Sequence, residues 1–300
     1  MKTLITGGTG LVGSHFTKGT KVSTKDYNLL DDNQVKQMYE DHSPEVVIHT
    51  AGRVGGVGAN IKYLGDFFYE NIKMNSSVIH HAKEYNVKKL VAFTSTCIFP
   101  SNVEYPLVEE KIHQGEPFGS HYAYAYAKRM VDIQSRAYNE QFGTKFFSVI
   151  PVNIYGPNDN FHLEDSHVVP ALIHKIFLAK ENNTDLVLWG TGKPLREFIY
   201  VKDIVNLTEI LADKYEGTKS VILSTSQETS IKEITHLLCD LIGFKNKVIF
   251  DSNKPDGQFR KPSDNSYLKS IVGDYEFTPL EQGLTETVEW FLANYPNIRK

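Results

Sequence analysis

The stretch Lys2-Thr-Leu-Ile-Thr6, followed by Gly7-Gly-Thr-Gly-Leu-Val-Gly13, decides the fold. Its first five residues are typical of a short buried strand, and the glycines that follow have the spacing G-x-x-G-x-x-G. Between a strand and a helix, such a turn lets backbone N–H groups and the positive helix end approach a pyrophosphate. The pattern predicts a dinucleotide-binding turn, with a brief helix because Gly19 follows soon after Gly13.

Strand and helix patterns alternate from this turn onward. We expect strands at 21–24, 44–49, 89–94 and 145–150, separated by helices at 28–42, 66–85 and 120–141. The alternation predicts an α/β fold, namely a Rossmann-type doubly wound parallel sheet.

Beyond about residue 158 the alternation loosens, which predicts a smaller C-terminal α/β substrate domain. We therefore expect a dinucleotide-binding domain at 1–157 and a substrate domain at 158–300, with about 196–226 packing back on the first domain. Ligands of such sheets lie at the carboxyl ends of the strands. Gly7, Gly52, Ser95 and Asn153 should therefore face one crevice.

The composition is that of an ordinary globular protein, with 41% hydrophobic and 23% charged residues in a chain of 300. A net charge of −4 provides no basic surface for nucleic acid or for a membrane. A membrane span would require an apolar stretch of about 18 residues, and the sequence contains none. Cys97 and Cys239 are the two cysteines, so we expect no disulfide framework and a cytoplasmic location.

The end of the second expected strand carries Lys25 followed by Asp26. An acidic residue here selects the ribose hydroxyls of NAD, whereas a basic residue accommodates the 2′-phosphate of NADP. The pair favours NADP and leaves NAD open.

The stretch from Ser120 to Met130 alternates tyrosine with alanine, and only Tyr124 has a lysine, Lys128, four residues later. On a helix these two side chains lie on one face. At roughly 5.5 Å and a dielectric constant of about 20, the ammonium favours the phenolate by about 3 kcal/mol, or about two pKa units. We therefore expect Tyr124 to be a proton donor with a lowered pKa, although the same spacing also occurs on ordinary packed helices.

Four features resemble the extended short-chain dehydrogenase/reductases in order and spacing: the glycine turn, Ser95, the pair Tyr124 and Lys128, and Tyr155-Gly-Pro157. Within that family the chain is most similar to the GDP-L-fucose synthases. The matching blocks span nearly the whole chain: 54–60, 95–100, 153–162, 166–171, 196–201, 254–257 and 260–261.

The resemblance implies an enzyme that uses NADPH to epimerise C3 and C5 of a GDP-4-keto-6-deoxy-hexose and then to reduce C4, giving GDP-L-fucose or a close relative. Tyr124 would protonate the C4 oxygen, Ser95 would bond to the reacting carbonyl, and Lys128 would bind the nicotinamide ribose. Tyr122 and Tyr126 are assigned to packing or to the substrate wall. The expected cofactor-binding residues are Gly7, Gly10, Leu11, Val12, Gly13, Lys25, Ala51, Tyr124, Lys128 and Asn153.

Cys97 and His167 are similar to the family's epimerisation pair. Epimerisation removes a proton next to the ketone and returns one to the opposite face, so it needs two groups on opposite sides of the sugar. Cys97 could instead be a small buried hydrophobe, and its thiol must be activated to act as a base. His162 competes with His167 for the second role.

The resemblance also implies a GDP-linked 4-keto sugar as the partner, a homodimer built partly on the helix of Tyr124, and no metal. Lys175, Arg196 and Lys261 would hold the diphosphate, although related synthases often have arginine in place of Lys175. The expected substrate-binding residues are Val54, Asn153, His167, Lys175, Trp189, Arg196 and Lys261.

Three alternatives to the bifunctional enzyme are compatible with parts of the sequence. One is a C4-reductase alone, acting on a GDP-4-keto sugar such as a heptose or 6-deoxy-heptose after a separate epimerase. A dehydratase is disfavoured because Cys97 and Ile98 stand where that chemistry requires an acidic pair. A non-catalytic NADP-binding sensor is disfavoured because Tyr124 and Lys128 are both present.

Overall fold

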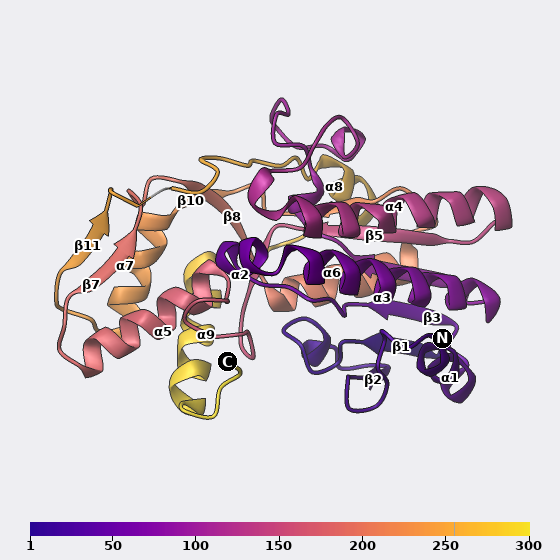
Figure 1. The fold of residues 1–300 in the computed structure, drawn as a ribbon, viewed down its shortest axis with the longest axis horizontal. Helices are drawn as coiled ribbons and strands as arrows, with labels where there is room; N and C mark the ends of the chain where they lie inside the picture. Colours follow the sequence, from indigo (N-terminus) through magenta and orange to yellow (C-terminus); the bar gives the residue numbers. More distant parts are fainter. Residues whose placement is uncertain (255) are drawn as a thin grey trace.

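A six-stranded parallel sheet lies at the centre of the larger part of the molecule in the computed structural model, which describes residues 1–254 and 256–300 (Figure 1). The strand order is β2-β1-β3-β4-β5-β9, and every neighbouring pair is parallel. The predicted doubly wound α/β fold is confirmed. The strands are β1 (Thr3–Thr6), β2 (Thr20–Val22), β3 (Val46–His49), β4 (Lys89–Phe93), β5 (Phe146–Pro151) and β9 (Val221–Leu223).

Alternate residues of these strands enter two separate hydrophobic cores. Leu4, Val47 and Leu90 face one core, while Ile5, Ile48 and Val91 face the other. This alternation follows from the two-residue period of a strand, and it explains why the strands are apolar throughout. The first core is covered by α1 (Asp32–His42), α3 (Leu64–Glu84) and α4 (Tyr122–Phe142), and the second by α6 (Val201–Lys214).

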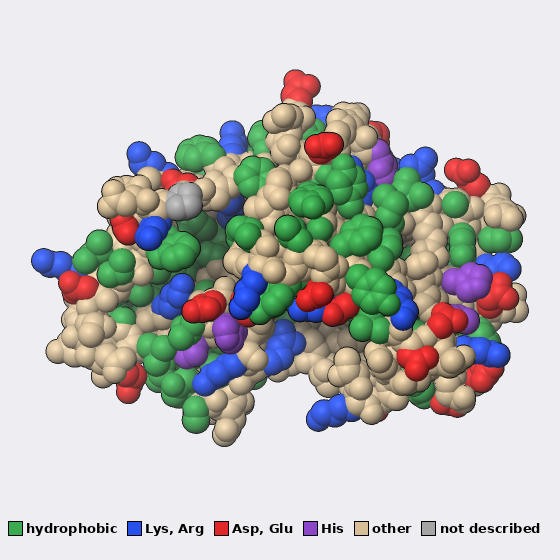
Figure 2. Space-filling view, viewed as in Figure 1, with side chains coloured by type: hydrophobic (Ala, Val, Ile, Leu, Met, Phe, Trp, Pro, Cys, Tyr) green, Lys and Arg blue, Asp and Glu red, His purple; other side chains and the backbone are tan. Residues whose placement is uncertain are grey.

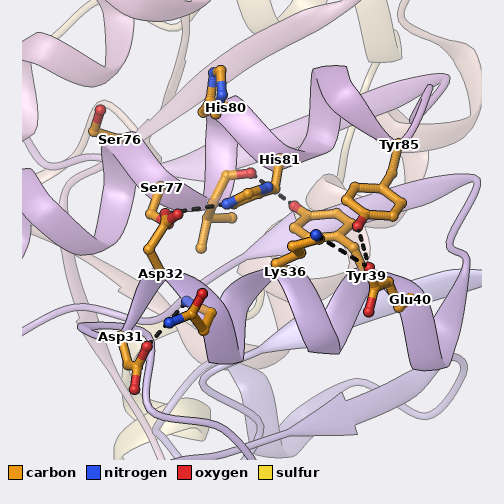
Figure 3. A network of polar contacts seen from close by, with 12 residues as sticks. Asp31, Asp32, Lys36, Tyr39, Glu40, Ser76, Ser77, His80, His81 and Tyr85 are labelled. Carbon is orange, nitrogen blue, oxygen red and sulfur yellow. Dashed lines mark hydrogen bonds and ion pairs between the residues drawn. The ribbon is translucent and has the colours of Figure 1, made fainter.

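Polar contacts between α1 and α3 fix the outer layer of the first core (Figure 3). The Asp32 carboxylate accepts a hydrogen bond from Ser77 at 2.5 Å and lies 3.1 Å from Nε2 of His81. The buried Tyr39 hydroxyl donates to the carbonyl of Val78 at 2.8 Å. Because these bonds satisfy polar groups at the interface of the two helices, they fix α1 and α3 relative to each other.

The lobe on the left of Figure 1 is built on two small sheets. The three-stranded sheet has the order β10-β8-β6, and the two-stranded sheet pairs β11 with β7. Its strands are β6 (Asn153–Tyr155), β7 (Leu186–Trp189), β8 (Leu195–Tyr200), β10 (Glu228–Ser230) and β11 (Val248–Asp251). The remaining helices are α2 (Val57–Lys62), α5 (Val168–Glu181), α7 (Ile231–Ile242), α8 (Ser266–Val272) and α9 (Leu280–Asn294).

The chain crosses between the two parts more than once. After β8, α6 contacts β4 and β9 joins the six-stranded sheet beside β5. The division into domains at 1–157 and 158–300 stays a prediction. Pro255, part of the matching block at 254–257, lies outside the described residues.

Two local expectations need correction. The helix after the glycine turn is reduced to a 3-10 turn at Gly13–His15, because the chain must reach β2 by Thr20. The second strand, expected at 21–24, instead runs from Thr20 to Val22. The helix that carries Tyr124 is close to its expected length. It ends at Phe142, and its C-cap residue is Gly143, whose φ of 67° suits a residue without a Cβ.

None of the helices in the described residues combines the length and the apolar character that a bilayer crossing requires.

The turn after β1 is closed by backbone packing that leaves no room for a side chain at Gly13. A Cβ there would lie 2.2 Å from the carbonyl oxygen of Gly7. We expect Gly13→Ala to lower the free energy of unfolding by about 1–3 kcal/mol, because the neighbouring atoms are backbone and cannot rotate away. Urea denaturation would measure this change.

Gly65→Ala is the matched control, since a Cβ on this residue of α3 meets nothing within 4 Å. Alanine is the better helix former, so this variant should be neutral or stabilised by up to about 1 kcal/mol. Equal destabilisation by both substitutions would contradict the packing argument.

Candidate active site

The glycine turn lies at the switch point of the sheet, where β2 and β3 flank β1 on opposite sides. Ligands of doubly wound sheets bind at such a point, outside the carboxyl ends of the strands. Gly7, with φ of 73°, approaches Ala51 so closely that a Cβ would lie 2.8 Å from the Ala51 nitrogen. This close backbone cradle fits a dinucleotide diphosphate, and it places the expected residues Gly7, Gly10, Leu11, Val12, Gly13 and Ala51 together.

The residues after β2 distinguish between the two nicotinamide cofactors. The Asp26 carboxylate accepts hydrogen bonds from the backbone N–H and the hydroxyl of Ser23, at 2.8 and 2.9 Å. The Lys25 ammonium has no acceptor among the described residues and is exposed. Because the acid is committed to its own turn while the cation is free, the arrangement fits the 2′-phosphate of NADP.

Tyr124 and Lys128 lie in the first two turns of α4, against the ends of β3 and β4. The Lys128 side chain is 2% exposed, and its ammonium donates to the carbonyl of Phe93 at 3.0 Å. A Cβ on Gly52 would lie 3.0 Å from the same nitrogen, so the glycine makes room for it. The Tyr124 ring is 8% exposed and meets Phe67 edge to face, with ring centroids 6.2 Å apart.

The predicted lowering of the Tyr124 pKa is wrong for this structure. Burial raises the pKa of Tyr124 well above its ordinary value, and the negative charge of Cys97 adds to the rise. Burial also lowers the pKa of Lys128 to about 8, and its ammonium is directed to the Phe93 carbonyl. Desolvation therefore outweighs the attraction estimated from the sequence. A phenol in this state keeps its proton at neutral pH.

Ser95 and Cys97 follow β4, in a short 3-10 turn at Thr96–Ile98. The Ser95 hydroxyl oxygen accepts a hydrogen bond from the backbone N–H of Cys97 at 3.3 Å. Cys97 is half-buried and packs against the cluster that contains Tyr124. The structure thus brings the serine, the thiol and the phenol to one place, as the sequence predicts.

The environment of Cys97 favours the thiolate. Burial alone would raise the pKa of the thiol, but the charge of Lys261 and contacts with His121 and Ser95 together lower it to about 5. The other cysteine, Cys239, is 5% exposed, and burial followed by the charge of Asp240 raises its pKa to about 11. Cys97 is therefore the activated thiol, which is the condition for its use as a base.

His121 is a site residue that the sequence reasoning missed. It lies at the end of the 3-10 turn Gly119–His121, directly before α4, and stacks on Phe118 with ring centroids 5.8 Å apart. Its Nε2 is buried without a hydrogen-bond partner among the described residues. Its position three residues before Tyr124 could have indicated that it lies near the site. Its contact with Cys97 could not be predicted, because that contact exists only in the folded chain.

Arg196 and Lys261 bring two cations to the same region. The Arg196 guanidinium donates to the carbonyl of Leu195 at 2.7 Å, and a Cβ on Gly257 would lie 3.3 Å from its other terminal nitrogen. Burial lowers the pKa of Lys261, whereas the Cys97 charge raises it. These two expected diphosphate ligands therefore lie within electrostatic reach of the thiolate.

A cavity of about 480 Å³ opens beside this group, between the loop after β4 and the residues that precede Lys261. It is lined by Ser101, Asn102, Tyr105, Phe118, Gly119, Gln258, Phe259 and Arg260. No local pattern in the chain predicts this cavity, because its two walls are far apart in the sequence.

Trp189 and Lys175 lie apart from the Cys97 group. Trp189, at the end of β7, is 73% exposed, and the Lys254 ammonium lies 5.5 Å from the centroid of its ring. Lys175 is exposed on α5. No contact among the described residues joins either side chain to Cys97, so their roles as substrate ligands stay predictions.

The loop that contains Val54 is hydrogen-bonded to the loop before His167 and packs closely against it. The Gly56 N–H donates to the carbonyl of Asp165 at 2.8 Å, and a Cβ on Gly56 would lie 2.7 Å from the Ser166 oxygen. His167 is the N-cap residue of α5, and its side chain still reaches solvent. Desolvation by the surrounding residues and then the charge of Arg299 lower its pKa.

Two further side chains have structural contacts. His162 Nδ1 accepts hydrogen bonds from the N–H groups of Glu164 and Asp165, at 3.2 and 3.1 Å, so it holds its own turn. This favours His167 as the epimerisation residue. The Asn153 amide donates to the carbonyl of Glu197 at 2.8 Å, which joins β6 to β8 and leaves its oxygen available.

The fold and this site define a nucleotide-sugar-modifying dehydrogenase. Residues 3–223 match the family model described as the NAD dependent epimerase/dehydratase family, and the chain belongs to that family. A GDP-L-fucose synthase from Dictyostelium discoideum is 46% identical, over 99% of this chain and 97% of that protein.

Solved structures show the same similarity. A GDP-L-fucose synthetase from Naegleria fowleri bound to NADP is 39% identical, with a TM-score of 0.93 over 99% of this chain and 96% of that one. A GDP-6-OMe-4-keto-L-xylo-heptose reductase from C. jejuni is 27% identical, with a TM-score of 0.89 over 98% of each chain. The NADP-bound relative agrees with the cofactor that Lys25 favours.

The lowered pKa of Cys97 predicts its reactivity. Alkylation by iodoacetamide requires the thiolate, so its rate should rise with a midpoint near pH 5 and level off well below pH 7. Removing the Lys261 charge in Lys261→Met should move the midpoint upward. Peptide mass spectrometry at a series of pH values would measure both.

Cys239 serves as the internal control and should stay unmodified, because it is buried and its pKa is raised. A Cys97 rate that continues to climb between about pH 7 and 9, as for an ordinary thiol, would contradict the assignment.

Proposed function

We propose that this protein is an NADPH-dependent epimerase/reductase that converts a GDP-4-keto-6-deoxy-hexose into GDP-L-fucose or a close relative. The observation that carries this proposal is the pairing of Cys97 with Tyr124. The surroundings of Cys97 favour its thiolate, and the surroundings of Tyr124 favour its protonated phenol, although the two side chains pack in one cluster. Titratable neighbours whose pKa values are driven apart are typical of an acid and base assignment.

Epimerisation uses the thiolate. Cys97 removes the proton from a carbon next to the C4 ketone and becomes a thiol, while the Ser95 hydroxyl bonds to the C4 oxygen, on which negative charge develops. His167 returns a proton to the opposite face.

Reduction uses the phenol. The nicotinamide of NADPH supplies the hydride to C4 when it is bound. Tyr124 donates its proton to the C4 oxygen, and Lys128, one turn further along the same helix, would bind the nicotinamide ribose. Since both residues project from one rigid helix, the donor keeps its position relative to Ser95 and the end of β4.

Arg196 and Lys261 would bind the GDP diphosphate, with the planar Arg196 guanidinium able to make paired bonds to phosphate oxygens. Their charges also support the Cys97 thiolate. Substrate binding and base activation would thus depend on the same two cations.

A C4-reductase acting alone is the second candidate, and the similarity to the C. jejuni heptose reductase favours it. The ionised Cys97 favours the bifunctional enzyme, because a reductase has no need of a second base.

The deciding experiment incubates the protein with NADPH and GDP-4-keto-6-deoxymannose in heavy water. We expect deuterium at C3 and C5, protium from NADPH at C4, and loss of NADPH absorbance, with NMR of the product to locate each isotope. Reduction without exchange would leave the C4-reductase, and no NADPH oxidation with any GDP-4-keto sugar would exclude the enzyme.

Two variants separate the half-reactions. Tyr124→Phe should keep NADPH binding and exchange while reduction falls at least about 100-fold, because the general acid is lost. Cys97→Ser should abolish exchange and still reduce a substrate that has already been epimerised. Near-normal turnover of Tyr124→Phe would contradict its role.

We further propose a homodimer and a cytoplasmic location. Cys97 must stay a free thiol, which a reducing compartment favours. The dimer would use the face formed by α2, α3 and α4, where hydrophobic side chains gather in the centre of the view (Figure 2). The exposed apolar residues of these helices include Val57, Ile61, Phe68, Tyr69 and Tyr122.

Such a patch is typical of an interface, and a twofold axis would place the same patch on both copies. Light scattering after gel filtration should give twice the mass of one chain for the wild type. The Phe68→Glu variant should give the mass of a single chain. Ile249→Glu, at another exposed apolar position on β11, should leave the dimer intact. A wild-type monomer at micromolar concentration would exclude this interface.

A further inference from the structure

The segment after α9 returns to the glycine turn. Ile298 is 8% exposed and belongs to the larger hydrophobic core, and the carbonyl of Arg299 accepts a hydrogen bond from the N–H of Phe161 at 2.9 Å. These contacts fix the backbone of the segment. A Cβ on Gly10 would lie 3.8 Å from Nη1 of Arg299, so the guanidinium lies beside the turn.

The loop after β6 completes this arrangement. The Asn158 amide donates to the carbonyl of Thr9 at 3.4 Å and to the hydroxyl of Ser14 at 3.0 Å. The loop that holds Arg299 through Phe161 is thus bonded to both sides of the glycine turn. The backbone of Arg299 is therefore linked to the glycine turn through the 158–161 loop.

The guanidinium is uncommitted. Among the described residues, Arg299 donates no side-chain hydrogen bond and makes no salt bridge, although an arginine offers five N–H donors. Other cations near the turn are occupied. Lys21 donates to the carbonyl of Ser14 at 2.7 Å, and Lys202 pairs with Glu286 at 2.6 Å.

A buried carboxylate beside Arg299 is also incompletely bonded. Asp159 is 2% exposed; one of its oxygens accepts from the Asn160 N–H at 2.7 Å, and the other has no partner among the described residues. Burial raises the pKa of Asp159 to about 7, while that N–H and the Arg299 charge oppose the rise. Such an oxygen would bond readily to one edge of a guanidinium and leave the other edge free.

Some backbone N–H groups of the glycine turn already donate hydrogen bonds within the protein and are not available to an anion. The Gly8 N–H donates to Val22 at 2.8 Å and the Gly10 N–H donates to Gly7 at 2.9 Å. A diphosphate carries two negative charges. A side-chain cation at this point would therefore supply hydrogen bonds and positive charge in place of the backbone N–H groups that are already bonded.

We propose that Arg299 binds the diphosphate of NADPH beside Gly10, and that Asp159 is the positioning residue that orients its guanidinium. This inference rests on NADPH being the cofactor, as proposed above. It assigns cofactor binding to a residue far from the nucleotide-binding turn in sequence, and it makes the loop at 158–161 part of the cofactor site.

The test measures dissociation constants for NADPH and NADH, without sugar, by fluorescence of the reduced nicotinamide. Arg299→Ala should weaken both by about tenfold or more, because both carry the diphosphate and a charged hydrogen bond is lost. Arg299→Lys should recover part of the loss. Lys300→Ala is the control and should bind both as the wild type does.

A loss confined to NADPH would overturn the proposal in favour of a contact with the 2′-phosphate. Unchanged binding of both nucleotides by Arg299→Ala would also overturn it, while wild-type reduction would leave the proposed function standing. A wild-type protein that binds neither nucleotide would overturn both inferences.

Asp159→Asn tests the positioning role. It should weaken both nucleotides by less than Arg299→Ala does, and it should add nothing in the Arg299→Ala background, because it acts through the guanidinium. Additive losses would overturn that role, since they would mean that Asp159 acts independently. Thermal unfolding of each variant identifies any loss that comes from misfolding.

Discussion

The cost of removing charge from water governs the site around α4. Tyr124 and Lys128 are buried and Cys97 is half-buried, and each of these ionisable side chains meets a different balance of desolvation and nearby charge. For Tyr124 desolvation dominates and the proton stays on. For Cys97 desolvation is outweighed by the charge of Lys261 and by contacts with His121 and Ser95, so the thiolate is favoured. One region of low polarity therefore holds an acid and a base at neutral pH.

This balance depends on close backbone packing beneath the side chains. Gly52 leaves the space that the Lys128 ammonium occupies, Gly7 lets the turn approach Ala51, and Gly13 lets the turn close on the backbone of Gly7. A Cβ at any of these positions would enter space already held by backbone or by a buried cation. The glycines thus serve the fold and the site through the same contacts, which is why the most constrained part of the chain is also the part that fits a dinucleotide.

The site is assembled from segments that are distant in sequence. The cations near Cys97 come from β8 and from the stretch before α8, while the charge near His167 comes from the segment after α9. Because the epimerisation base and the diphosphate ligands share charges, the lobe built on β7, β8 and β11 supplies chemistry as well as a binding surface. A change in the position of that lobe would alter the ionisation of Cys97.

The amino-acid sequence alone is enough to predict the doubly wound sheet, the turn at Gly7–Gly13, and the candidate residues Ser95, Cys97, Tyr124 and Lys128, because strand period, glycine spacing and helix spacing are local properties. It could not determine how far each side chain is removed from water, so it gave the wrong direction for the Tyr124 pKa. Nor could it place His121 beside Cys97, or Arg299 beside Gly10, since those contacts join residues with no local relation. Only the tertiary structure decided which titratable groups share a desolvated space, and that sharing sets their charge.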